Sequence, residues 1–181
     1  MRFILAALIF FALPAFANNL SSRYEVIGQM DVIVDGEELI LPIAVDLEAG
    51  RSFAEIQEFF GVRNLTISGV SVSEDGSWDR PIVSLMIGLG NGPFGGLSNV
   101  SLSEKGRDLQ HPTEANIEYG KMEMTDFSIT DQGEVELDFT AELIRFVLDE
   151  EYNQTPEEGL APVAISGHVS VVIPAEFQAL E

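Results

Sequence analysis

Three oxygen-bearing side chains at alternate positions are the first group in this chain that could bind an ion. Asp75, Ser77 and Asp79 have the spacing with which calcium loops present their first ligands. Such a loop also needs a bidentate glutamate further along, and Leu85 and Met86 occupy the region where it would lie. We interpret the segment as a charged turn and keep a calcium site as the alternative.

A second acidic group lies in the C-terminal third. Asp149, Glu150 and Glu151 are consecutive, and residues 157–158 add two more glutamates. Carboxylates gathered on one loop can hold a divalent cation, although a loop that is simply solvated has the same composition. We predict no cofactor and no resident metal, with calcium at these acidic groups as the alternative.

A glycine-rich segment, residues 90–95 (GNGPFG), has the glycine spacing of a dinucleotide-binding loop. That loop requires a following helix whose N-terminus receives the pyrophosphate, but the residues that follow here are typical of a strand. We therefore expect a connecting loop. Because loops held by rigid strands often carry binding residues, Gly92, Phe94 and Gly95 are candidate ligand contacts, together with Trp78 in the preceding turn.

The sequence shows no residue pattern that identifies a catalytic site, and we predict no catalytic residues. The two histidines, His111 and His168, would both be needed with a carboxylate to bind zinc in a chain without cysteine. A serine triad would need one of them as its base, and neither accompanies a nucleophile elbow. We expect both at the surface, with His168 on the polar face of the last strand. Paired carboxylates for glycoside hydrolysis are a further possibility, but with so many acids no pair stands out.

The charge is strongly unbalanced, with 30 acidic and nine basic residues and a net charge of −21. Binding to phosphate groups needs clusters of Lys and Arg, so nucleic acid is excluded as a partner and anionic membrane is disfavoured. The acidity suits a cationic partner, and it also suits a surface that merely stays solvated. The absence of cysteine rules out a disulfide framework.

The first 17 residues are typical of an export signal. Arg2 precedes the apolar run 3–13, Pro14 follows, and residues 15–17 (AFA) match the small-x-small pattern of signal peptidase sites. The run is too short for a permanent membrane span. We expect cleavage of residues 1–17 and one exported domain, residues 18–181, that is periplasmic or secreted and not stably inserted in a membrane.

Alternating hydrophobicity predicts strands over most of the remaining chain. Residues 24–34 and 39–47 flank the turn pair Asp35-Gly36, as in a tight hairpin, and Pro42 indicates a sheet edge. Residues 134–143 and 163–173 also alternate. We expect eight or nine strands in a single all-β domain, either a sandwich or a flattened antiparallel barrel.

One segment has helical spacing instead. Ser52 and Glu55 match a capping box, Phe53 and Ile56 begin an apolar stripe that continues at residues 59–60, and Gly61 would end the helix. We predict one short helix from 52 to 61 that closes an open end of the β core.

The central and C-terminal half resembles an uncharacterised group of exported bacterial β-proteins. The resemblance lies in residues 92–96 (GPFGG), the strand 137–146, and residues 166–169 (SGHV). Two cysteines often bracket the variable loop in that group, whereas Ile144 and the region near Leu160 occupy those places here. The resemblance implies an exported all-β protein and brings no activity with it.

These features together predict a non-enzymatic binding or interaction module that uses end loops, residues 90–96 and 149–162. Its partner would be a protein or a small apolar ligand. One alternative is a β-barrel carrier of an apolar ligand. Another is an exported hydrolase acting on glycans. An eight-stranded outer-membrane barrel fits less well, because the sequence ends without an aromatic residue and has few Trp and Tyr for interface girdles.

Overall fold

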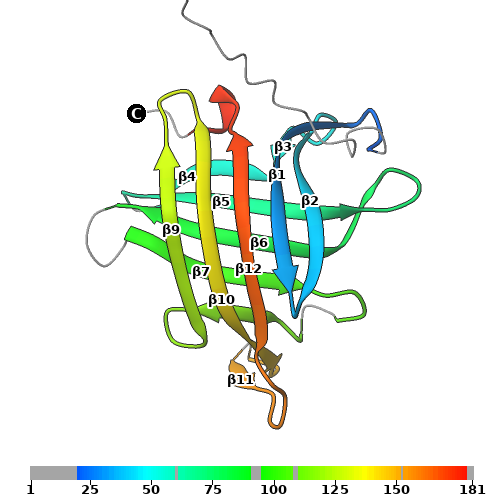
Figure 1. The fold of residues 1–181 in the computed structure, drawn as a ribbon, viewed down its shortest axis with the longest axis vertical. Coiled ribbons are helices and arrows are strands. Elements are labelled where there is room, and N and C mark those ends of the chain that lie inside the picture. The colour runs from blue at the N-terminus through cyan, green and yellow to red at the C-terminus, as the bar shows by residue number, and fades with distance from the viewer. Residues whose placement is uncertain (1–19, 60, 91–94, 108–109, 152, 179–181) are drawn as a thin grey trace, which may run out of the picture.

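The protein is an all-β sandwich of two crossed layers of antiparallel strands (Figure 1). The computed structural model describes residues 20–59, 61–90, 95–107, 110–151 and 153–178. The predicted export signal, residues 1–17, lies outside this range. The front layer contains β1 (Tyr24–Val34), β2 (Glu37–Asp46), β3 (Arg51–Ser52), β9 (Lys121–Ile129), β10 (Glu134–Leu148) and β12 (Val163–Val172). The back layer contains β4 (Ala54–Phe59), β5 (Val62–Val72), β6 (Trp78–Leu89), β7 (Gly95–Ser103) and β8 (Thr113–Asn116).

The described strands form one 12-stranded sheet that does not close into a barrel, so the sandwich alternative is confirmed. The order is β3-β2-β1-β12-β10-β8-β7-β6-β5-β4, with β9 and the short β11 (Gln154–Pro156) each paired to β10. The number of strands expected from the sequence, eight or nine, is lower than the 12 described. The additional strands include β3, β8 and β11, which have two to four residues each and are too short to show a hydrophobic period.

The sheet continues from one layer to the other at two corners. The long β10 pairs with β12 along its first part and reaches β8 at Ile144 and Arg145. The second corner is the segment that runs through β3 and β4. At its bend, the Phe53 N–H donates to the Ala44 carbonyl (2.9 Å), and the Phe53 carbonyl accepts from the Ser68 N–H (2.7 Å).

The helix predicted for residues 52–61 is wrong, because this second corner is extended. Ala54 and Ile56 alternate with outward residues and are buried, so the effective period is two. The Ser52 hydroxyl bonds to the Ala54 backbone and does not cap a helix. Gly61, at φ +78°, turns the chain from β4 into β5, and Phe60 lies outside the described residues. Helical structure in the described part is the single 3-10 turn η3 (Ala175–Phe177).

The hairpin β1–β2 is confirmed, with Asp35 and Gly36 at positive φ in its turn. Pro42 faces Gln29 of β1, and on its other side β2 pairs only with β3, at Val45 and Asp46. The predicted edge position is therefore correct for the part of the chain that the structure describes.

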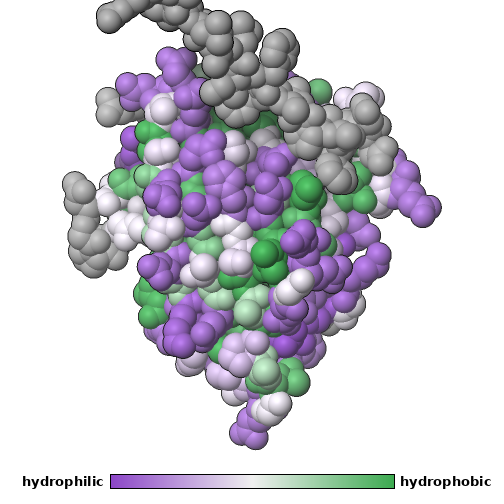
Figure 2. All heavy atoms as spheres, in the orientation of Figure 1, coloured by the Kyte–Doolittle hydropathy of each residue, from purple (hydrophilic) through white to green (hydrophobic). Residues whose placement is uncertain are grey.

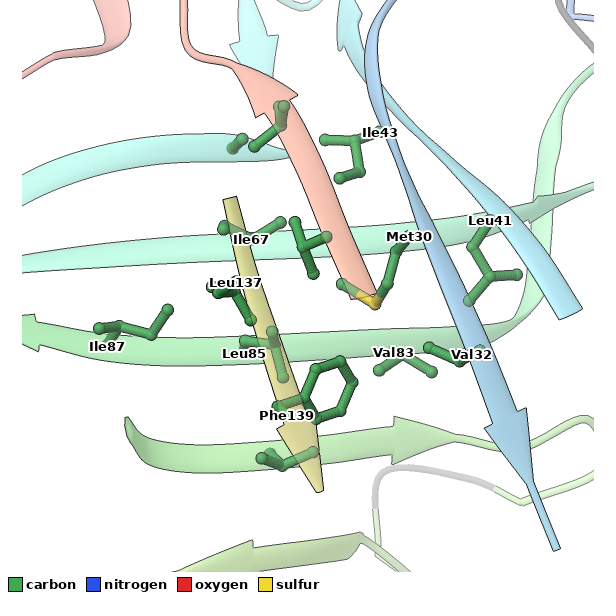
Figure 3. Close-up of a cluster of buried hydrophobic side chains, with 14 of the residues drawn as sticks. Met30, Val32, Leu41, Ile43, Ile67, Val83, Leu85, Ile87, Leu137 and Phe139 are labelled. Atoms are coloured by element: carbon green, nitrogen blue, oxygen red, sulfur yellow. The ribbon is translucent and has the colours of Figure 1, made fainter. Parts of the chain in front are cut away.

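The interior between the layers is filled with aliphatic and aromatic side chains. In Figure 3, Leu41 lies beside Met30 in the front layer, and Phe139 lies beside Leu85 of the back layer; Ile67 belongs to the same cluster. The alternating apolar residues of β10 and β12 are buried: Val135, Leu137, Phe139, Ala141, Leu143, Val163, Ile165, Val169 and Val171. A fully buried Val, Leu, Ile or Phe side chain contributes about 1.5–3 kcal/mol of transfer free energy. In the described residues, no helix is both long enough and apolar enough to cross a membrane.

Candidate functional site

The outer face of the front layer is hollowed into an open groove of about 600 Å³. Its walls come from β1, β2, β10 and β12, which lie side by side in Figure 1. We call this the outer groove. The side chains that define its chemistry are Asp31, Ile33, Glu38, Ile40, Asp138 and His168.

Antiparallel pairing places four of these side chains in one row across the strands. Ile40 lies opposite Asp31, Asp31 opposite His168, and His168 opposite Asp138. Neighbours of Asp31 in the chain, Met30 and Val32, are buried in the core. Because successive side chains of a strand alternate between faces, the whole row is directed to the outer face.

His168 is held by two carboxylates of β10. Its Nδ1 lies 2.8 Å from Oδ1 of Asp138, and its Nε2 lies 3.0 Å from Oε2 of Glu136. Glu136 also accepts a hydrogen bond from the Ser170 hydroxyl (2.6 Å). This arrangement fixes the ring on one wall of the groove.

The opposite wall combines acidic and apolar side chains. Asp31 accepts hydrogen bonds from the neutral amide of Gln29, at 3.0 and 3.2 Å. Ile33 and Ile40 are each 44% exposed and lie opposite Glu38 and Asp31, respectively. Figure 2 shows a patch of hydrophobic residues near β1, with hydrophilic residues around it.

The floor of the groove depends on Gly167. A Cβ at this position would lie 2.7 Å from the Asp31 carbonyl oxygen, 2.7 Å from a Val32 methyl and 2.9 Å from the Phe139 ring. Glycine therefore allows β1, β12 and β10 to approach closely below the row of polar side chains.

The predicted end-loop residues do not form one site in the described part. Trp78 is 47% exposed but begins β6, whereas Gly95 begins β7 and pairs with Leu89 at the other end of β6. At about 3.3 Å per residue, the two lie ~35 Å apart along that strand. Gly92 and Phe94 are outside the described residues.

The first group of acidic calcium candidates already has hydrogen-bond partners in the protein. The Asp75 carboxylate accepts from the hydroxyls of Ser73 (2.5 Å) and Ser77 (2.7 Å), which lower the pKa of Asp75 to about 2. Asp79 accepts from the Arg80 N–H and from Lys105, and these bonds lower its pKa.

The second acidic group is likewise organised as a turn. Asp149 accepts from the side chain and backbone of Asn153 and from the Glu151 N–H, which lowers the pKa of Asp149. Glu150 and Glu151 are exposed. Within the described ranges, no group of three or more His, Asp or Glu side chains is placed to hold a metal ion.

A half-buried ion network lies away from the groove, where two loops meet β10. Arg145 binds Glu104 through Nη2 (3.0 Å) and Nε (3.3 Å), and Arg107 binds Glu157 (2.7 Å). Burial favours the neutral acid of Glu104, but hydrogen bonds from Arg145 and Thr113 outweigh it and lower the pKa of Glu104. These ion pairs hold the two loops against the sheet, and both arginines are bound to glutamates within the protein.

Sequence reasoning placed His168 on the polar face of the last strand, which is correct, but it did not find the outer groove. The alternation of Glu136 and Asp138 with buried residues was visible, as was the polar position of His168. What was missing was the pairing of β10 with β12, which brings these side chains into contact.

Comparison of the sequence with models of known protein families, and with curated proteins, finds no match. The resemblance to exported bacterial β-proteins therefore stays a prediction.

Proposed function

We propose that the protein is an exported, non-enzymatic binding module whose outer groove takes a positively charged ligand. One observation supports this most strongly. The groove brings together carboxylates and solvent-exposed isoleucines on a rigid sheet, and Asp31 is held there by a neutral amide. A surface of this kind is typical of a binding site more than of a merely solvated face.

The overall charge supports a cationic ligand. At −21, the protein attracts cations over a distance comparable to the Debye length, about 8–10 Å at moderate salt, and repels phosphate-rich partners. Binding of this kind is expected to weaken as salt rises. The export part of the proposal rests on the signal-like residues 1–17.

The packed interior gives the carrier alternative less support. Side chains of both layers meet in the core, including Met30, Leu85 and Phe139, so the space between the layers is occupied by the protein itself (Figure 3). A ligand on the outer face needs no such space.

The test uses a fluorescent oligolysine peptide and the full mature protein. We expect salt-sensitive binding by anisotropy, weakened about tenfold or more in Asp31→Asn/Glu38→Gln, since each lost charge contact is worth about 1 kcal/mol in water. The matched control, Glu150→Gln/Glu151→Gln, removes the same charge from an exposed turn and should weaken binding far less. Equal losses in both variants, or no binding to the wild type, would refute the proposal.

A further inference from the structure

The ligand of the outer groove can be specified further, on the basis of the proposed function. Along β1 the outward positions alternate Asp31 and Ile33, and along β2 they alternate Glu38 and Ile40. Pairing sets Ile33 opposite Glu38 and Asp31 opposite Ile40. Acidic and apolar side chains therefore form a chequered pattern of four positions.

We infer that this pattern binds a basic peptide in an extended conformation, with basic and apolar side chains alternating on the face that meets the groove. Side chains on one face of an extended peptide are two residues apart, about 6.6 Å, which is the spacing of Asp31 and Ile33 along β1. A basic side chain near Asp31 thus places the next side chain on that face near Ile33.

The apolar positions argue against a simple polycation. A polyamine or an oligolysine would leave Ile33 and Ile40 in water, each 44% exposed, and would gain nothing from them. An aliphatic side chain of the ligand near Ile33 would remove apolar surface from water. A second copy of this chain is a poor occupant, because its charge of −21 would oppose approach.

The hydrogen bonds of the groove side chains favour a cationic ligand that lies over β1 and β2. Asp138 and Glu136 already face the His168 ring, whereas the Asp31 carboxylate is held by the neutral Gln29 amide. The carboxylates on the isoleucine side are therefore the ones that gain most from an added positive charge.

The test compares two synthetic peptides of equal charge, one with the repeat Lys-Ser-Leu-Ser and one with Lys-Ser-Ser-Ser, and spermine as a polyamine. For the wild type we expect the leucine peptide to bind about tenfold tighter than the serine peptide. This preference should disappear in Ile33→Ser/Ile40→Ser. It should persist in Ile117→Ser/Leu160→Ser, which removes exposed apolar side chains from loops. Urea unfolding of each variant establishes that it folds.

The outcomes separate the inference from the proposed function. If both peptides and spermine bind the groove equally well, the inference is overturned and the cation-binding proposal stands. If the loop variant removes the leucine preference, the apolar contact lies elsewhere and the inference is again overturned. If no cationic probe responds to Asp31→Asn/Glu38→Gln, the proposed function fails and the inference fails with it.

Discussion

Replacement of Gly167 by alanine should destabilise the protein through one added methyl group. The new Cβ would lie 2.7 Å from the Asp31 carbonyl oxygen, closer than real Cβ contacts, and 2.9 Å from the Phe139 ring. The Asp31 oxygen belongs to the backbone of the paired strand β1, so it cannot move away as a flexible side chain could. The clash therefore has to be relieved by a shift between β1 and β12.

Overpacking of this kind typically costs about 1–3 kcal/mol. For a domain of 150–250 residues each kcal/mol lowers the melting temperature by about 2–4 °C, so we expect a decrease of ~2–12 °C. Circular dichroism and urea unfolding measure it. Ser166→Ala, at the outward neighbour, is the control and should change stability by less than about 0.5 kcal/mol. If the Gly167→Ala variant has the same melting temperature as the wild type, the close approach of β1, β12 and β10 is refuted.

Three further predictions concern the fold. Leu85→Ala should cost about 2–5 kcal/mol in urea unfolding, because Leu85 is 1% exposed between the layers; a loss below 1 kcal/mol would contradict the packed core. Glu104→Gln should destabilise by ~1–3 kcal/mol because it leaves Arg145 half-buried with a weaker partner, and the double variant with Arg145→Met should recover part of the loss. The Arg23 hydrogen bonds lower the pKa of Asp46 to about 2, which is below its value in the unfolded chain. The resulting stabilisation is therefore present above about pH 4 and is lost as the pH falls towards 2. Asp46→Asn should flatten this part of the curve of unfolding free energy against pH, and an unchanged slope would contradict the Arg23–Asp46 ion pair.

Local patterns predicted much of the fold. The hairpin around Asp35 and Gly36, the Pro42 edge and the inward faces of β10 and β12 all follow from turn chemistry and a period of two. These features depend on residues close together in the chain, and the structure confirms them.

The errors arose where tertiary contacts decide the outcome. The phenylalanine spacing at residues 53–60 fits a helix, but the Phe53 backbone bonds to Ala44 and Ser68 in opposite layers, and these bonds hold the segment extended. The outer groove was missed for a related reason. Its side chains come from strands distant in sequence, and only the register of β12 against β1 and β10 places His168 between Asp31 and Asp138.

The most direct test of the binding surface is an NMR titration of the isotope-labelled mature protein with the Lys-Ser-Leu-Ser peptide. Binding in the outer groove predicts the largest amide shift changes at Asp31, Ile33, Ile40 and His168, with small changes around Trp78 and Gly95. Changes concentrated at the ends of β6, or confined to the 149–162 loop, would contradict the assignment of the groove as the ligand site.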